Sequence, residues 1–270
     1  DAIECVKLSK QHKVHIFALK TKSCGCLVDH LMRLNSPADA WGFYLEILGC
    51  GYSPNLYNFN ALMHKFCKEG KIREAKLVFD EIRKWGLRPS VVSFNTLING
   101  YCKLGDVEEG FRLKKVMEGS RLVPDVFTFS ALINGLCRER KLDDANRMFD
   151  EMCRNGLVPN DVIFTTLING FCKNGKVGLA MEIYRKMEVE GVKPDLITYN
   201  TLINGLCKSG NLGEARNLFN EMAVKGLKAD KVTYTTLIDG CCKEGDLEVA
   251  LEIKNRMLHE GIELDNVAYT

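Results

Sequence analysis

Residues 91–125 read VVSFNTLINGYCKLGDVEEGFRLKKVMEGSRLVPD, and residues 196–230 read LITYNTLINGLCKSGNLGEARNLFNEMAVKGLKAD. The two stretches align without a gap, and the same 35-residue unit runs through six complete copies. Their bounds are 56–90, 91–125, 126–160, 161–195, 196–230 and 231–265, and residues 266–270 begin a truncated seventh copy. A fixed period of this length is typical of a repeat protein, in which each copy is one supersecondary unit.

Each unit holds two helical patterns. In one unit, apolar residues recur at helical spacing from Phe94 to Tyr101, and Gly105 supplies the left-handed turn that ends this first helix. A second apolar seam follows and closes, in the next unit, at Gly156 before Pro159. One hairpin cannot bury its own apolar faces, so the hairpins must stack. The sequence predicts an all-α, right-handed superhelical solenoid of two-helix repeats, with first helices on the concave face and second helices on the convex face.

Residues 1–55 carry a weaker form of the same pattern. Residues 27–33 suit a first helix, residues 40–48 suit a second helix, and Pro54 stands at the expected end. This region is therefore predicted to be a degenerate repeat or N-terminal cap.

Composition excludes several functional classes. No run of about 18 apolar residues occurs, so no membrane span is predicted. The net charge is only +2, so any site for a polyanion must come from local placement of Lys and Arg. The five histidines lie outside any metal or nucleophile motif, and no phosphate-binding glycine loop is present. The sequence predicts no catalysis, no cofactor and no metal.

Six of the twelve cysteines recur every 35 residues, at Cys67, Cys102, Cys137, Cys172, Cys207 and Cys242. Spacing by a whole repeat places these thiols in separate hairpins, where each is expected to pack as a small apolar residue. Free thiols of this kind are typical of a reducing compartment.

The 35-residue period, the stretch TYNTLINGLCKSG at 198–210 and the segments LFNEM and GLKAD that follow it resemble the pentatricopeptide repeat family. Tetratricopeptide repeats, which bind peptides, have a period of about 34 residues, which the constant 35 argues against. The single unit length resembles the P-class of the family. The first-helix sequence VVSFNTLINGYCK, residues 91–103, resembles the fertility-restorer-like branch. The resemblance implies a single-stranded RNA ligand, monomeric binding, possible protein partners in RNA processing, and residence in a mitochondrion or chloroplast. No targeting segment is recognised, so that address rests on the resemblance alone.

Two columns of the repeat vary while their neighbours do not. The first, inside the first helix, is the reading column: Asn60, Asn95, Ser130, Thr165, Asn200 and Thr235. The second, at the end of each unit, is the closing column: Ser90, Asp125, Asn160, Asp195, Asp230 and Asp265. The resemblance implies that each pair reads one base. The alternative interpretation is that both columns are polar residues at helix starts, with the closing column serving as N-caps.

The residue types suit base recognition. An ionised Asp only accepts hydrogen bonds, which suits the ring N–H of uracil or guanine, whereas Asn and Ser also donate, which suits adenine or cytosine. In the reading column, Asn fills the space beside a pyrimidine, and the shorter Ser or Thr leaves room for a purine. Taken in order, and with RNA parallel to the chain as the family binds it, the pairs predict 5′-CUAGUG-3′.

Two further columns complete the predicted groove. An apolar column is expected to sandwich the bases: Tyr57, Val92, Phe127, Val162, Ile197, Val232 and Val267. A basic column is expected to bind phosphates: Lys68, Lys103, Arg138, Lys173, Lys208 and Lys243. Ordinary helix-start packing and favourable interaction with the helix dipole are the alternative explanations. The competing function is a protein- or peptide-binding scaffold, which helical solenoids often provide.

Overall fold

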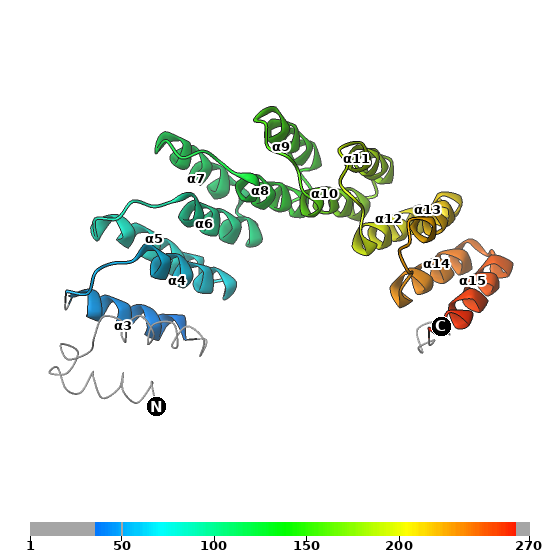
Figure 1. The fold of residues 1–270 in the computed structure, drawn as a ribbon, viewed down its shortest axis with the longest axis horizontal. Helices are drawn as coiled ribbons and strands as arrows, with labels where there is room; N and C mark the ends of the chain where they lie inside the picture. Colours follow the sequence, from blue (N-terminus) through cyan, green and yellow to red (C-terminus); the bar gives the residue numbers. More distant parts are fainter. Residues whose placement is uncertain (1–35, 50, 263–270) are drawn as a thin grey trace. The chain divides into compact units, whose positions relative to one another are not determined.

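The computed structural model describes residues 36–49 and 51–262 of the chain, and every regular element in these ranges is a helix. The helices, coloured along the chain in Figure 1, are α3 (Pro37–Gly49), α4 (Leu56–Lys68), α5 (Ile72–Lys84), α6 (Val91–Lys103), α7 (Val107–Gly119), α8 (Val126–Arg138), α9 (Leu142–Arg154), α10 (Asp161–Lys173), α11 (Val177–Val189), α12 (Leu196–Lys208), α13 (Leu212–Val224), α14 (Lys231–Glu244) and α15 (Leu247–His259). Two helices of about equal length fall in each 35-residue unit. The predicted all-α solenoid of two-helix repeats is confirmed.

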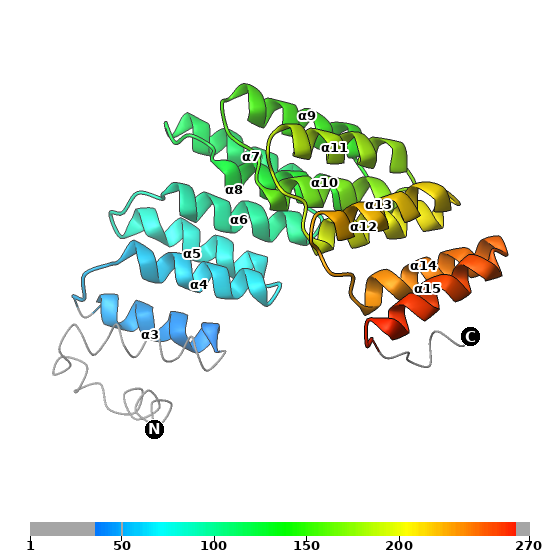
Figure 2. The same cartoon turned by 45° about the vertical axis from the view of Figure 1, so that its right-hand side comes forward.

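The chain forms two compact units, which divide within α8 after Gly135. In the first unit, α4 pairs with α5, α6 pairs with α7, and the first helices α4 and α6 pack on each other. In the second unit, three hairpins follow one another, and the first helices α10, α12 and α14 pack in series (Figure 2). Within each unit, first helices therefore form one continuous layer. The second helices α5, α7, α11, α13 and α15 each pack on the first helix of their own repeat.

Helix boundaries follow from capping residues and left-handed turns. Asp195 caps α12, because its carboxylate accepts a hydrogen bond from the backbone N–H of Thr198 at 2.8 Å. Gly210 then ends the hairpin's first helix with a φ of 74°. Two repeats place an arginine where the others have this kind of glycine: Arg121 and Arg140 have φ values of 61° and 60°. A side chain in this region is strained, so both positions cost stability.

Aromatic rings join neighbouring hairpins in the core. Phe79 of α5 meets Phe94 of α6 edge to face, with ring centroids 5.1 Å apart, and Phe149 meets Phe164 in the same way at 5.4 Å. Each pair joins a second helix to the first helix of the next repeat. The aromatic contacts therefore bury the face that a single hairpin leaves open.

Successive first helices approach closely where a glycine of one repeat faces the recurring cysteine of the repeat before it. A Cβ atom built on Gly205 would lie 2.6 Å from Sγ of Cys172 in the preceding repeat, and one on Gly240 would lie 2.8 Å from Sγ of Cys207. The same contact recurs at Gly100, which meets Cys67. Glycine in each repeat thus makes room for the thiol of the repeat before it.

The predicted packing of the cysteines is confirmed for five of the six. Cys67, Cys102, Cys137, Cys172 and Cys207 are free thiols and at least partly buried. Burial raises the pKa of Cys172 to about 11, so this thiol stays protonated at neutral pH. Cys242 differs: it is exposed, since no later first helix in the described ranges covers it.

A polar cluster joins α11, α12 and α13 on the side of the second helices. The hydroxyl groups of Tyr184 and Tyr199 lie 3.0 Å apart, and both donate to the carboxylate of Glu221, at 2.5 Å and 3.0 Å. Lys225 forms ion pairs with Glu221 and with Glu188. The cluster satisfies polar groups that the stacking of two hairpins partly buries.

Some sequence predictions fall outside the described residues. They are the first helix expected at 27–33, the closing residue Asp265, the apolar residue Val267 and the truncated copy 266–270. The helix expected at 40–48 is observed as α3. No helix in the described part of the chain combines the length and apolar character that crossing a bilayer requires.

Candidate nucleic-acid interface

The face of each first helix that bears the reading column also bears the basic column. In α6, Asn95, Asn99 and Lys103 follow at intervals of four residues, so they lie one above the other on the helix. The reading residue stands near the helix N-terminus, and the basic residue stands in its last turn. Packing of successive first helices repeats this arrangement along each unit.

Asn95 and Asp125 contact each other directly, although they belong to the start and end of one repeat. Nδ2 of Asn95 donates to Oδ1 of Asp125 at 2.9 Å. The hydroxyl of Thr128, in the next first helix, donates to Oδ1 of Asn95 at 2.6 Å and lies 3.0 Å from Oδ1 of Asp125. The three side chains form one hydrogen-bonded group across two repeats.

The second unit contains the same group. Asn200 donates to Asp230 at 3.1 Å, and Thr233 donates to Asn200 at 2.6 Å. Partial burial by itself would raise the pKa of Asp230, but hydrogen bonds from Thr233 and Asn200 outweigh it, so the pKa lies below its usual value. The carboxylate is therefore ionised, and acts only as an acceptor, at neutral pH.

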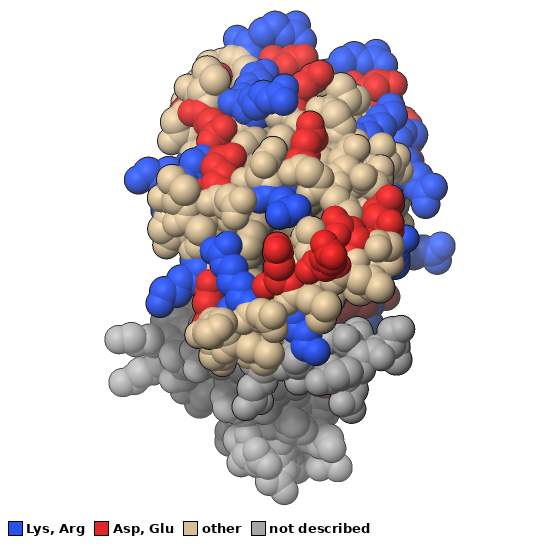
Figure 3. All heavy atoms as spheres, turned by 90° about the vertical axis from the view of Figure 1, so that its right-hand side faces the viewer, with Lys and Arg blue, Asp and Glu red and all other residues tan. Residues whose placement is uncertain are grey.

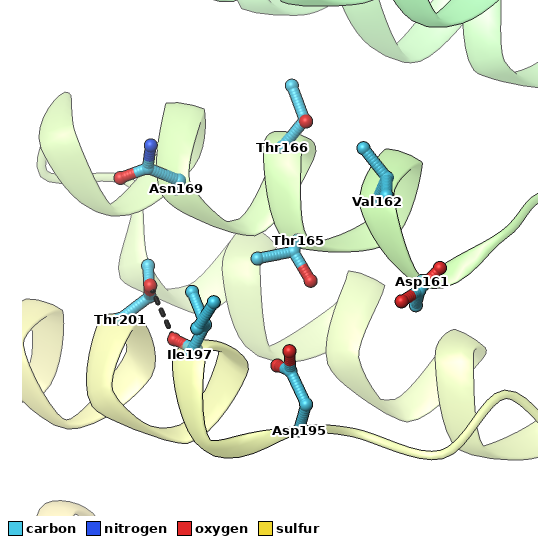
Figure 4. A pocket seen from close by; sticks show the side chains of 8 residues that line it. All are labelled: Asp161, Val162, Thr165, Thr166, Asn169, Asp195, Ile197 and Thr201. Atoms are coloured by element: carbon cyan, nitrogen blue, oxygen red, sulfur yellow. Dashed lines mark hydrogen bonds between the residues drawn. The ribbon is translucent and has the colours of Figure 1, made fainter. Parts of the chain in front are cut away.

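Two other pairs are joined through the third residue of the next first helix rather than directly. Ser93 donates to Asn60 at 2.7 Å and lies 3.3 Å from the hydroxyl of Ser90. In the second unit, the hydroxyl groups of Thr165 and Thr198 lie 3.0 Å apart, and Thr198 donates to Asp195 at 2.7 Å. Figure 4 shows Thr165 and Asp195 pointing toward each other from α10 and from the start of α12.

The closing column also caps helices. Ser90, Asn160, Asp195 and Asp230 are the N-caps of α6, α10, α12 and α14, as the alternative interpretation expected. Capping uses one side-chain oxygen in each case and does not exclude a second contact. Ser130 and Asn160 belong to different units. The hydroxyl of Thr235 donates back to its own helix, at Lys231 O, 2.9 Å away.

The members of the apolar column are exposed in every described repeat, although their side chains are apolar. Its six described members are between 55% and 72% exposed, with Val162 at the lower limit and Phe127 at the upper. Cavities lie between successive members. One, of about 460 Å³, is lined by Val92, Asn95, Asp125 and Phe127 among others. Another, of about 300 Å³, lies between Val162 and Ile197 beside Thr165 and Asp195 (Figure 4). A planar group entering either cavity would contact apolar side chains on two sides and polar ones at its edge.

All members of the basic column are exposed in the last turns of the first helices. Lys243 is partly neutralised by Asp239 at 2.7 Å, one turn earlier in α14. On the face drawn in Figure 3, basic and acidic side chains are interspersed, in keeping with the small net charge of +2.

Two sets of residues escaped the sequence reasoning. One lies a helical turn beyond the reading column and is mostly amides: His64, Asn99, Asn134, Asn169, Asn204 and Asp239. Of these, His64, Asn99 and Asn134 line the larger cavity, and Asn169 lines the smaller. The other is the third residue of each first helix, such as Thr128. The 35-residue period and the four-residue offset from the reading column would have identified the amides.

These features define a helical-repeat protein whose first helices carry periodic polar and apolar columns, and comparison with known proteins gives its family. The profile described as "PPR repeat family" matches residues 89–138, 124–172, 159–208, 194–243 and 230–270, and that described as "Pentatricopeptide repeat domain" matches 47–103. The chain belongs to the pentatricopeptide repeat family.

Individual relatives align with different shares of this chain. A putative pentatricopeptide repeat-containing protein of Arabidopsis thaliana is 57% identical over 84 residues, which are 31% of this chain and 13% of the relative. The pentatricopeptide repeat protein PPR10, in complex with an 18-nt psaJ RNA element, superposes with a TM-score of 0.77 at 25% identity over 99% of this chain and 39% of its own. The PPR domain of Arabidopsis thaliana protein-only RNase P 1, in complex with tRNA, has a TM-score of 0.55 at 16% identity, covers 64% of this chain and 91% of its own, and shares the fold. The chain thus spans well under half the length of the first two relatives.

Proposed function

We propose that this chain binds single-stranded RNA in a sequence-specific manner, with one base per repeat and without catalysis. The observation that carries the proposal is the recurring group in which a reading residue and a closing residue meet beside two exposed apolar side chains. Asn95 and Asp125 between Val92 and Phe127 are the clearest instance. A base that stacks between apolar side chains presents its Watson–Crick edge to such a pair.

The residue pairs specify the bases through their donors and acceptors. The carboxylates of Asp125, Asp195 and Asp230 accept from the ring N–H of uracil or guanine. Asn160 and Ser90 also donate, which suits adenine and cytosine. With the six pairs taken in chain order, the proposed core is 5′-CUAGUG-3′. The complex of PPR10 with RNA supports RNA as the ligand class.

The basic column supplies affinity that does not depend on sequence. Exposed Lys173 and Lys208 stand two turns beyond the reading residues of α10 and α12, where they reach a backbone that follows the groove. Such binding needs no reactive group. Within residues 36–49 and 51–262, no three His, Cys, Asp or Glu side chains gather as a metal site.

The family's typical location supports action on transcripts in a mitochondrion or chloroplast, in processing, stabilisation, splicing or translation. A fluorescent fusion of the whole protein that contains this chain tests this part of the proposal. Fluorescence confined to the cytosol or nucleus would contradict it.

The binding proposal is tested by selection of RNA from a random pool with the purified chain. We expect enrichment of 5′-CUAGUG-3′, with binding of a short RNA that carries this core and little binding of the same bases in scrambled order. A pool without an enriched motif would overturn sequence-specific binding. Stable capture of a peptide in the groove, with no binding of RNA, would favour the scaffold alternative instead.

A further inference from the structure

A fully buried hydroxyl group stands at the third residue of four first helices. We call these the bridging hydroxyls: Ser93, Thr128, Thr198 and Thr233. Each contacts the reading residue of the preceding repeat, at a distance of 3.0 Å or less between the two side chains. Each belongs to a different repeat from the residue it contacts, so the contact exists only when the hairpins stack.

The bridging hydroxyl of Thr128 orients the amide of Asn95. Its oxygen accepts from the backbone N–H of Asp125 at 3.2 Å, and its proton is directed to Oδ1 of Asn95 at 2.6 Å. The amide nitrogen then faces the carboxylate of Asp125. The opposite amide orientation would bring two acceptor oxygens within about 3 Å, which is unfavourable. Thr128 and Asp125 together therefore hold the amide in one orientation.

This arrangement sets which atoms are offered to a base. The hydrogen bonds that hold Asp125 end on its Oδ1 atom, so these contacts leave Oδ2 available to accept from a ligand. The same amide nitrogen of Asn95 has a second hydrogen, which the bond to Asp125 does not use. An acceptor next to a donor matches the N–H and carbonyl of uracil, whereas the bare ring nitrogen of cytosine would face the carboxylate.

We propose that the bridging hydroxyls are positioning residues that sharpen base selection by fixing the reading and closing side chains. The inference rests on the proposed RNA binding, which it extends by one residue per site. Among the five repeats whose following first helix is described, the repeat that ends at Asn160 is the exception, because the third residue of α10 is Ile163, which has no hydroxyl. Among the first five nucleotides of the core, the third is accordingly the least sharply selected.

The test compares Thr128→Val, which keeps the shape and removes the hydroxyl, with Thr128→Ser, which restores it. The probes are short RNAs that contain 5′-CUAGUG-3′ and its variants with C at the second or fifth position. Thr128→Val should lower the preference for U over C at the second nucleotide by about fivefold, the effect of one ordinary hydrogen bond. The preference at the fifth nucleotide should stay unchanged, and Thr128→Ser should restore selection.

Asp106→Ala is the control for an effect of lost stability on base preference. Asp106 caps α7 through the N–H of Glu109, at 3.1 Å, in the loop at the opposite end of α6 from Asn95, so this variant loses a cap without touching a reading pair. It should leave the preference at the second nucleotide intact. Thr233→Val repeats the experiment at the fifth nucleotide in the second unit, so misfolding of one variant does not remove the test.

The outcomes separate the two proposals. If the unmodified chain prefers U and the valine variants keep that preference, or lose it equally at both nucleotides, the positioning role is overturned and RNA binding stands. If the unmodified chain shows no preference between bases, the proposed function itself fails.

Discussion

The amide nitrogen of Asn95 lies 2.9 Å from a carboxylate oxygen of Asp125, although 30 residues separate them in the chain. The two side chains meet because the closing residue caps the next first helix, which packs directly on the helix that carries the reading residue. Asn200 and Asp230 repeat the contact at 3.1 Å. A pair formed in this way can be changed one repeat at a time.

Asn160→Asp should change the base that its repeat selects. Asp is as good an N-cap as Asn, so the hydrogen bond to the N–H of Ile163 is kept and the fold should be unaffected. The loss of the amide donor should move the preference at the third nucleotide from A toward G by about 1–3 kcal/mol. Binding to four RNAs that differ only at this nucleotide measures the change, and an unaltered preference would contradict the assignment of the closing column.

Lys173→Ala should weaken binding to every RNA alike, because a lysine on the backbone carries no base information. For the unmodified chain, a plot of log affinity against log salt concentration should have a slope of about −4, from roughly six phosphates at about −0.7 each. The variant should reduce the slope by about one contact. Lys193→Ala, in the loop after α11, is the matched control; an equal loss there would argue against the basic column.

Gly205→Ala should destabilise the second unit by about 1–3 kcal/mol, because the new methyl group would meet Sγ of Cys172 at 2.6 Å. Gly213→Ala is the control, since nothing lies within 4 Å of its added Cβ and alanine favours a helix. Urea unfolding measures both. Adding Cys172→Ala should recover part of the loss; a strictly additive double variant would show that the two residues do not compete for space.

Arg140→Gly should stabilise the chain by about 0.5–1 kcal/mol, because it removes a side chain from a left-handed turn with a φ of 60°. The gain is partly offset by the greater freedom of glycine in the unfolded state. Thermal unfolding of Arg140→Gly and Arg140→Ala separates the effects, since alanine keeps the strain. A similar gain in both variants would assign the cost to the charge instead.

The cluster around Glu221 should make the free energy of unfolding decrease at acidic pH. Burial alone would raise the pKa of Glu221, but Lys225, Tyr184 and Tyr199 lower it through their hydrogen bonds. A carboxyl whose pKa is lower in the folded state stabilises the fold above its unfolded value, about 4.3, and this stabilisation is lost as the pH falls through the folded pKa. Urea unfolding from neutral pH to about pH 3 should show a shallower decline for Glu221→Gln. An unchanged decline would remove Glu221 as its source.

The positions of the columns in the candidate site followed from the period, whereas their expected roles came from the family resemblance. Because every unit has 35 residues, a residue at one position recurs at the same place on every first helix, so the reading, apolar and basic columns could be identified without a structure. The exposure of the apolar column was not accessible in this way: helix-start packing was the alternative for Phe127 and Val92 until the structure showed both side chains exposed. The bridging hydroxyls were missed because Thr128 and Ser93 look like ordinary residues of a helix start.

The repeat length, the helices, their glycine turns and the columns were determined by the sequence by itself, because they depend on local propensity and on a periodicity that needs no knowledge of distant contacts. Only the tertiary structure decided which residues meet. The packing of α6 on α8 brings Asp125 and Thr128 to Asn95, and the packing of α10 on α12 seats Cys172 against Gly205. Such contacts join consecutive repeats, and their distances depend on how closely two helices approach each other. The volume of the side chains at the helix interface sets this approach, and the repeat pattern of the sequence does not give it.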